Sequence, residues 1–381
     1  MRTLGLYVHL PFCRRKCLYC DFCSRADTDL ALWERYVTSL CRDLAARAAD
    51  CREYTVNTVY FGGGTPTLLP PLLLLRVLDC IRAHYRVDKD AEITLECNPA
   101  TGGKEAFAAL REGGFNRVSV GLQSTHENEL RALGRIHTFA DFEKTFFELR
   151  QAGFSNISAD LMSGIPEQTL ESYLESVRRL CALGPEHIST YGLILEEGTP
   201  LHAARERLPL PDEEEAREMY LRAAELLAQQ GYRQYEISNF ARAGYESRHN
   251  LKYWNCEEFL GFGSGAYSDF GGARFGYARD IDGYASGECA LESYESPGRN
   301  ERMNEYVMLR MRLSAGVHAR EFEARFGRSF EERFGRALSR YEAGGWVRRT
   351  ADGCSFTKEG FYVSNAILSE ILDFSTDEDV K

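Results

Sequence analysis

Three cysteines, Cys13, Cys17 and Cys20, lie near the start of the chain with the spacing C-x3-C-x2-C. Thiolates this close in sequence can converge on one soft metal centre. Structural zinc sites and ferredoxin-type four-iron clusters both use four protein ligands. Three cysteines on a four-iron cluster would leave one iron open, where a chelating small molecule could bind and receive an electron. The alternatives are a zinc site completed by Cys23, or three unrelated buried thiols.

Other candidate ligand-binding residues stand where strand-like runs end. The run 55–61 continues into Gly62-Gly63-Gly64-Thr65, where the missing Cβ atoms would let backbone N–H groups approach a ligand. A carboxylate at Glu96 could bind hydroxyl or ammonium groups. Taken singly, each candidate also has an ordinary explanation as a tight turn, a helix cap, a solvated group or a core tyrosine. The remaining candidates are Tyr7, Gln123, Arg135 and Asp160.

Six strand-like runs alternate with helical segments, which predicts right-handed βαβ units and a parallel sheet. Doubly wound sheets concentrate a site at one switch point, whereas barrels gather side chains from many strand ends. Because candidate residues follow all six runs, we expect an α/β fold with a (β/α)6 partial TIM-like barrel. The predicted strands are 4–10, 55–61, 92–97, 116–122, 156–161 and 187–195, and the first helix begins at Asp29 with Leu30, Trp33, Val37, Leu40 and Leu44 on one face.

The last quarter of the chain has a different character. Residues 287–300 are polar and show little apolar periodicity, so we predict a domain 1–290 followed by a domain 291–381. Helical segments, short strands around the turn at Gly344-Gly345 and a final helix predict a small, mostly helical, winged-helix-like domain.

Composition restricts the partners and the compartment. The 381 residues carry a net charge of −11, which disfavours binding to nucleic acid. No run approaches the roughly 20 apolar residues that span a bilayer, so we predict no transmembrane segment. The twelve cysteines come without a secretory segment, which predicts a reducing compartment and hence a cytoplasmic protein.

The cysteine motif followed by an aromatic residue resembles that of the radical S-adenosylmethionine (SAM) enzymes. Longer stretches are similar to the oxygen-independent coproporphyrinogen III oxidase family and cover most of residues 4–270, among them YVHLPFCRRKCLYCDF, YFGGGTPTLL, ITLECNP, RVSVGLQS and ISADLMSGIP. The tail resembles that family's C-terminal domain. The resemblance implies that Cys13, Cys17 and Cys20 hold a [4Fe–4S] cluster. It also implies SAM contacts from Tyr7, Gly63, Gly64, Thr65, Glu96, Gln123, Arg135 and Asp160.

Two features divide that family. The true oxidase carries a further cysteine two residues after the third ligand, where this chain has Phe22. The ending Tyr19-Cys20-Asp21-Phe22 instead resembles the heme chaperone branch, HemW, and so does the motif H-N-x-x-Y-W that begins at His249. The resemblance implies that His249 is a candidate heme ligand, with packing beneath the barrel as the alternative. Cys23 departs from both patterns, and we interpret it as a spare thiol rather than an occasional cluster ligand.

The leading hypothesis is a heme chaperone that binds heme and hands it to an acceptor protein, with a respiratory protein as the candidate. The alternatives are coproporphyrinogen III dehydrogenase, which would decarboxylate propionates through a radical, and a related radical SAM methyltransferase. Phe22 and the H-N-x-x-Y-W motif count against the oxidase, so whether the protein is an enzyme is left open. If SAM is cleaved, an electron donor such as flavodoxin or ferredoxin is required.

Overall fold

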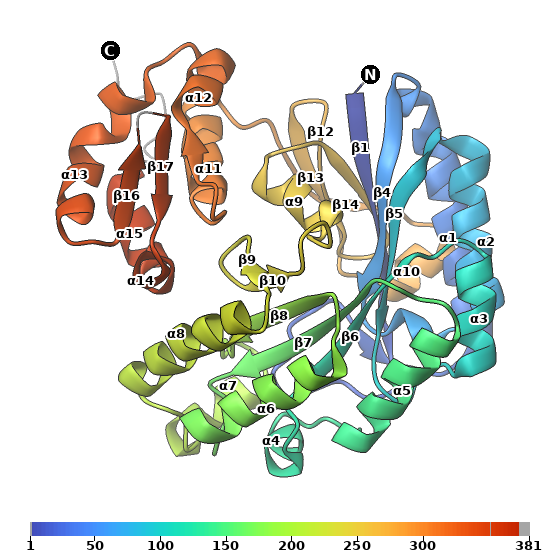
Figure 1. Ribbon diagram of the computed structural model, residues 1–381. Helices are drawn as coiled ribbons and strands as arrows, with labels where there is room; N and C mark the ends of the chain where they lie inside the picture. The colour runs from blue at the N-terminus through green and yellow to red at the C-terminus, as the bar shows by residue number, and fades with distance from the viewer. Residues whose placement is uncertain (1, 351, 373–381) are drawn as a thin grey trace.

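Six parallel strands form the centre of one twelve-stranded sheet in the computed structural model, which describes residues 2–350 and 352–372. Their order in space is their order in the chain, and each pairs in parallel with the next. Figure 1 shows the sheet bending so that β7 and β8 lie across the direction of β1 and β4. The predicted α/β partial barrel is therefore confirmed. The strands are β1 (Arg2–Leu10), β4 (Tyr54–Gly63), β5 (Val87–Cys97), β6 (Arg117–Gln123), β7 (Ile157–Ser163) and β8 (His187–Gly192).

Helices between the strands cover the outer face of the sheet (Figure 1). In α1 (Leu30–Arg47) the Asp29 side chain caps the N-terminus by accepting from the Ala31 N–H at 2.9 Å. The predicted apolar face of α1 is buried except at Leu30, which is 49% exposed because it lies in the first turn. The other covering helices are α2 (Pro71–His84), α3 (Lys104–Glu112), α4 (Glu127–Ala132), α5 (Phe139–Gln151) and α6 (Leu170–Leu183).

Both edges of the barrel sheet carry further strands besides the six predicted parallel ones. On one edge β11 (Phe259–Phe262) pairs parallel with β1 and continues into an antiparallel meander of β12 (Tyr267–Phe270), β13 (Ala273–Tyr277) and β14 (Leu291–Glu295). On the other edge β8 ends at Gly192, three residues earlier than predicted, and pairs with β10 (Asn239–Ala241), which pairs with β9 (Arg233–Gln234). These additions cover edges that would otherwise be open to aggregation.

A second hydrophobic core lies in the C-terminal part of the chain, which Figure 1 shows as a separate orange and red lobe. Its buried side chains come from residues 303–372 and include Tyr306, Phe322, Phe334 and Leu338. The lobe contains α11 (Arg299–Arg310), α12 (Ala319–Phe326), α13 (Arg336–Ala343), α14 (Lys358–Tyr362), α15 (Ser364–Ile371) and a small sheet of β15 (Val317–His318), β16 (Val347–Thr350) and β17 (Gly353–Phe356). The division at residues 290 and 291 stays a prediction, and residues 373–381 of the predicted second domain lie outside the described residues.

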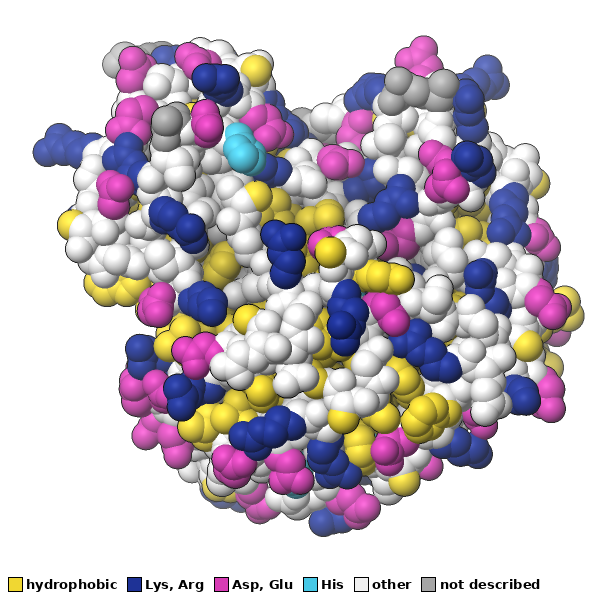
Figure 2. All heavy atoms as spheres, viewed as in Figure 1, with side chains coloured by type: hydrophobic (Ala, Val, Ile, Leu, Met, Phe, Trp, Pro, Cys, Tyr) yellow, Lys and Arg dark blue, Asp and Glu magenta, His cyan; other side chains and the backbone are white. Residues whose placement is uncertain are grey.

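The C-terminal lobe is contacted by α8 (Glu213–Gln229) through α14 and by α9 (Arg248–Trp254) through α11. The remaining helices are α7 (Pro200–Ala204), which follows β8, and α10 (Ile281–Ser286), which packs on α1. On the face drawn in Figure 2, basic and acidic side chains are interspersed, and hydrophobic side chains show in the hollow between the two lobes. Among residues 2–350 and 352–372, none of the helices combines the length and the apolar character that a bilayer crossing requires.

Candidate functional site

A cavity of about 550 Å³ opens where the parallel strands end, and most of the predicted site residues line it. This is the end at which barrels assemble ligand sites from several strands. Its volume is within the roughly 300–1,000 Å³ range of small-molecule sites. The predicted residues in its wall are Cys13, Cys17, Cys20, Gly63, Gly64, Glu96, Gln123, Arg135 and Asp160, whereas Tyr7, Thr65 and His249 stand behind the wall.

The cysteine loop is closed by a short parallel pairing of β2 (Phe12–Cys13) with β3 (Arg25–Ala26). The Thr65 hydroxyl donates to Cys13 Sγ at 3.7 Å, and Arg135 donates to Cys17 Sγ at 3.5 Å. Burial raises the pKa of the Cys13 and Cys20 thiols, while hydrogen bonds from Thr65 and from the Phe22 backbone act in the opposite direction. Donors aimed at sulfur are what a thiolate-bound cluster uses, so the loop fits an iron–sulfur cluster.

Within the part of the chain that the structure describes, no group of three His, Cys, Asp or Glu side chains is placed to hold a single metal ion. Cys23 is not part of the cavity wall, and its sulfur lies 3.4 Å from the Ser264 hydroxyl, which agrees with a spare thiol.

The triple glycine allows β4 to pass very close to the cysteine loop. A Cβ on Gly64 would lie 2.6 Å from the carbonyl oxygen of Phe12, and Gly63 has a φ of +110°. The amides of this segment are occupied by the protein itself: the Gly63 N–H donates to Glu96 at 3.0 Å, and the Thr65 N–H donates to the Phe12 carbonyl at 2.8 Å. The glycines thus position the loop and the Glu96 carboxyl, and they leave little backbone free for a ligand.

Two half-buried carboxyl groups face the cavity. Glu96 accepts from the Tyr60 hydroxyl at 2.8 Å, and burial raises its pKa to about 7. Asp160 accepts from the Ser119 hydroxyl at 3.2 Å, and burial raises its pKa as well. Because burial penalises the charged form of a carboxyl group, a cationic ligand beside these two groups would restore their charge and gain electrostatic attraction. The interior of the cavity therefore favours a ligand with positive charge.

Arg117 was not recognised from the sequence, although it belongs to the same wall. Its side chain is 2% exposed, lines the cavity, and its Nε atom has no hydrogen-bond partner among the described residues. A buried guanidinium nitrogen without a partner is suited to an anionic group of a ligand. The strand alternation of period two could have revealed it, because Arg117, Ser119, Gly121 and Gln123 face the cavity in turn from β6.

Gln123 lies at a distortion of the strand. Its φ is +72°, which is unusual for a residue with a side chain, and the pairing of β6 with β7 shifts register at this point. The distortion turns the side chain into the cavity, where its Oε1 accepts from the Tyr191 hydroxyl at 3.0 Å. Unusual backbone held by its surroundings is commonly found at ligand sites.

Arg135 connects the cysteine loop to three other parts of the barrel. Besides Cys17 it donates to the Asn98 side chain at 2.7 Å and to the Gly121 carbonyl. It follows directly on α4, whose end is joined to the cysteine loop because the Leu18 N–H donates to the Leu133 carbonyl at 3.0 Å. The placement of α4 therefore determines where both the loop and Arg135 lie.

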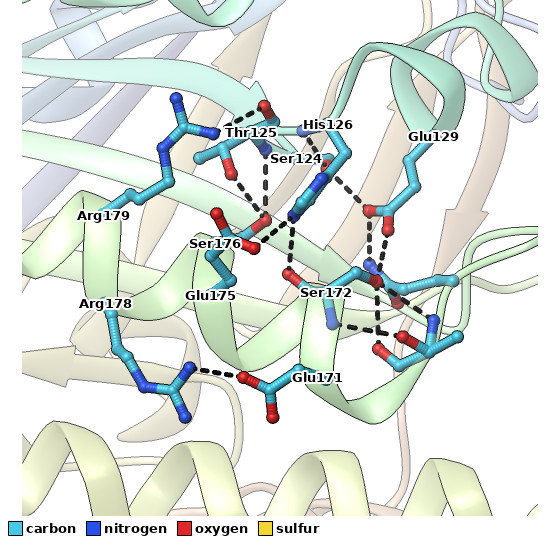
Figure 3. Close-up of polar contacts among 12 residues, drawn as sticks. Ser124, Thr125, His126, Glu129, Glu171, Ser172, Glu175, Ser176, Arg178 and Arg179 are labelled. Carbon is cyan, nitrogen blue, oxygen red and sulfur yellow. Dashed lines mark hydrogen bonds and ion pairs between the residues drawn. The ribbon is translucent and has the colours of Figure 1, made fainter.

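A buried polar network centred on Glu129 holds α4 in place (Figure 3). Glu129 is 1% exposed, and its carboxylate accepts from the hydroxyls of Ser124 and Ser172, both at 2.6 Å, and from the Gln168 amide at 3.0 Å. In Figure 3 these groups converge from α4, from the segment after β6 and from α6. Since charge-assisted hydrogen bonds are roughly twice as strong as neutral ones, this network is a rigid support for Arg135 and the cysteine loop.

The H-N-x-x-Y-W segment forms α9 and supports the cavity wall from behind. His249 is 1% exposed, its Nδ1 lies 2.9 Å from the Thr58 hydroxyl, and its Nε2 lies 2.8 Å from the Tyr253 hydroxyl. The Tyr60 ring stacks on His249 with centroids 5.2 Å apart and then holds Glu96. Both imidazole nitrogens are thus occupied, so heme ligation by His249 would require one of these bonds to open and stays a prediction.

Tyr7 has a similar supporting place in β1. Its ring stacks on Tyr60 with centroids 6.1 Å apart, and its hydroxyl lies 2.9 Å from His9 Nδ1. Of the α9 motif, only Asn250 is part of the cavity wall. The sequence pattern did not single out Tyr60. Its ring contacts both Tyr7 and His249, and its hydroxyl donates to Glu96, so Tyr60 links these two residues to the cavity wall.

Two family models match this chain. The radical SAM superfamily model matches residues 7–180, and the HemN C-terminal domain model matches residues 299–363. Together they cover the cysteine loop, the parallel strands from β1 to β7, most of α6, and most of the C-terminal lobe.

Full-length relatives give a more specific comparison. The heme chaperone HemW of Bacillus subtilis (strain 168) is 33% identical over 373 residues, which are 96% of this chain and 98% of that protein. Heme chaperone HemW of Escherichia coli (strain K12) is 34% identical over 97% of this chain and 98% of its own length. The solved structure of the E. coli coproporphyrinogen III oxidase HemN superposes with a TM-score of 0.86 over 98% of this chain and 91% of that one, at 22% identity, a likeness that concerns the fold alone.

Proposed function

We propose, from the premise that this chain belongs to the HemW family of radical SAM proteins, that it binds heme and transfers it to an acceptor protein. The observation that carries the proposal is the similarity to the B. subtilis and E. coli heme chaperones, which extends over nearly the whole of both chains. Phe22, which replaces the extra cysteine expected of an oxidase, supports the same assignment.

Cys13, Cys17 and Cys20 are the proposed ligands of a [4Fe–4S] cluster, which fits the donors found at their sulfurs. When bound, such a cluster supplies an open iron for the amino and carboxylate groups of SAM and a source of one electron. Thr65 and Arg135 keep the thiols oriented, and the close approach at Gly64 holds the loop against β4.

SAM is the proposed ligand of the cavity interior. Its positive charge suits the half-buried carboxyl groups of Glu96 and Asp160, and its carboxylate suits a nearby guanidinium such as Arg117. Gln123 and Arg135 complete the polar wall, while Gly63, Thr65 and Tyr7 act by positioning it. We assign SAM a structural or gating role for heme binding rather than a role in turnover.

The proposed compartment is the cytoplasm, because all twelve cysteines are free thiols in the structure, as a reducing compartment requires. The proposed acceptor is a respiratory heme protein. If SAM is cleaved, the electron would come from a flavodoxin or ferredoxin.

One anaerobic experiment tests the function. The cluster is reconstituted, heme is titrated by absorbance, and 5′-deoxyadenosine and protoporphyrinogen are assayed after addition of coproporphyrinogen III. We expect saturable heme binding and no porphyrinogen product. Multiple turnovers to protoporphyrinogen would overturn the chaperone in favour of the dehydrogenase, and the absence of both heme binding and product would favour the methyltransferase.

A further inference from the structure

The mouth of the cavity differs from its interior in both polarity and charge. Two large apolar side chains at the mouth are strongly exposed: Phe22 of the cysteine loop is 65% exposed and Ile194, in the loop after β8, is 68% exposed. Both belong to the wall of the same cavity. Exposed large apolar residues at the rim of a cavity indicate a surface that an apolar ligand covers.

Cations accompany these apolar side chains. Arg15 and Lys16 are exposed residues of the cavity wall, and the Lys16 ammonium lies 3.2 Å from the Phe22 carbonyl oxygen. Among the residues that the structure describes, neither has an ion-pair partner. The mouth also has two acidic groups, Asp21 and Glu196. Asp21 forms an ion pair with Arg279 at 3.4 Å, so Glu196 is the acidic group that stays available there. Two unpaired cations are therefore available to an anionic ligand at this place.

The interior carries groups of both charges. Glu96, Asp160, Arg117 and Arg135 lie there and form the polar wall proposed for SAM. The whole cavity, interior and mouth together, has a volume of about 550 Å³, which is the size of a site for one small molecule. With SAM in the interior, a flat apolar ring with carboxylate side chains is suited to the exposed apolar and cationic side chains of the mouth.

We infer that heme docks at the mouth of the cavity, with its porphyrin face against Phe22 and Ile194 and its propionates on Arg15 and Lys16. This rests on the proposed function, since it names the place of the heme that the protein carries. Heme at this place lies over the cavity entrance, so a ligand in the interior and heme at the mouth limit each other's exchange. His249, behind the wall, supports the site without touching this heme.

The test compares two rim variants with matched controls, all carrying the reconstituted cluster. Phe22→Ser with Ile194→Ser removes the apolar contacts, and Arg15→Glu with Lys16→Glu reverses the charge. Leu72→Ser, on α2 and 75% exposed, and Lys89→Glu, whose side chain is 90% exposed, are the corresponding changes away from the cavity. Iron content and circular dichroism establish that each variant is folded and loaded.

Heme and heme dimethyl ester, in which the propionates are uncharged, are titrated into each protein. We expect each rim variant to raise the heme Kd at least tenfold and both controls to leave it unchanged. The ester should bind the wild type more weakly than heme does, and the Arg15→Glu, Lys16→Glu variant, whose carboxylates repel propionates, should reverse this preference and bind the ester more tightly than heme. Rim variants that bind heme with wild-type affinity would overturn the inference while leaving the chaperone function intact, whereas a wild type that binds no heme would overturn the function itself.

Discussion

Glu129 offers the sharpest test of how the site is supported, because it is far from any ligand yet holds the segment that does touch one. Its carboxylate accepts three hydrogen bonds, from Ser124 and Ser172 at 2.6 Å and from Gln168 at 3.0 Å. Glu129→Gln keeps the volume but places an N–H₂ group where a donor now points. The amide oxygen can keep the bonds from Ser124 and Gln168, which both go to Oε2, so the N–H₂ group would face the Ser172 hydroxyl that now donates to Oε1.

The cost can be worked out from these bonds. A hydrogen bond to a charged group contributes about 1.5–3 kcal/mol, and a buried donor left unsatisfied costs about 1–3 kcal/mol. Loss of one such bond and weakening of a second predict a decrease of about 3 kcal/mol in the free energy of unfolding. Because α4 carries Leu133 and leads to Arg135, we also expect lower iron content after reconstitution and weaker SAM binding.

The assay is urea denaturation together with iron and sulfide analysis. The matched control is Glu127→Gln in the same helix, where a side chain 63% exposed forms only a 3.5 Å surface pair with Arg131. That pair should contribute about 0.5 kcal/mol or less. The reasoning is refuted if Glu129→Gln has the denaturation midpoint and the iron content of the Glu127→Gln control.

Four further predictions concern the cavity wall and the cysteine loop. Burial raises the pKa of Glu96 to about 7, so this group loses its proton between pH 6 and 8. The affinity of the protein for cationic SAM should therefore rise about tenfold over that range. In the same titration the Glu96→Gln variant should bind SAM weakly at every pH. Because of the same raised pKa, the free energy of unfolding of the ligand-free protein should fall as the pH rises from about 4.5 to about 7. If the free energy of unfolding of Glu96→Gln has the same pH dependence as that of the wild type, this prediction is contradicted. Gly64→Ala forces a Cβ to 2.6 Å from the Phe12 carbonyl oxygen. It should lower the free energy of unfolding, measured by thermal denaturation, by about 1–3 kcal/mol, and it should lower the iron content. Gly192→Ala, where the nearest atom is 3.9 Å away, should change neither. Cys23→Ser should retain the full iron content that Cys20→Ser loses, and equal losses in both would make Cys23 a ligand.

The barrel was predictable because its signals are local. Each of the six parallel strands has its own apolar run, and chain order is also spatial order. The cysteines follow β1, Glu96 lies near the C-terminal end of β5 and Asp160 lies in the middle of β7, so knowledge of the parallel sheet was enough to bring them to one end.

What the sequence concealed depends on contacts between distant segments. The stretch 260–268 has three glycines and resembles a loop, yet β11 is held in the sheet by its pairing with β1, more than 250 residues earlier. Arg117 stands at the start of a strand and was passed over, because its burial follows only from the closure of the barrel around it. The occupation of both His249 nitrogens by Thr58 and Tyr253 likewise depends on the packing of α9 against β4.

The central claim is that the protein hands heme to another protein, and the most direct test is a transfer measurement. The chain is loaded with heme, freed of excess, and mixed with heme-depleted respiratory membranes, while heme bound to serum albumin is the nonspecific control. The account predicts that heme enters membrane proteins faster from the loaded chain than from albumin, and that the Phe22→Ser, Ile194→Ser variant loses this advantage. Transfer no faster than from albumin would contradict it.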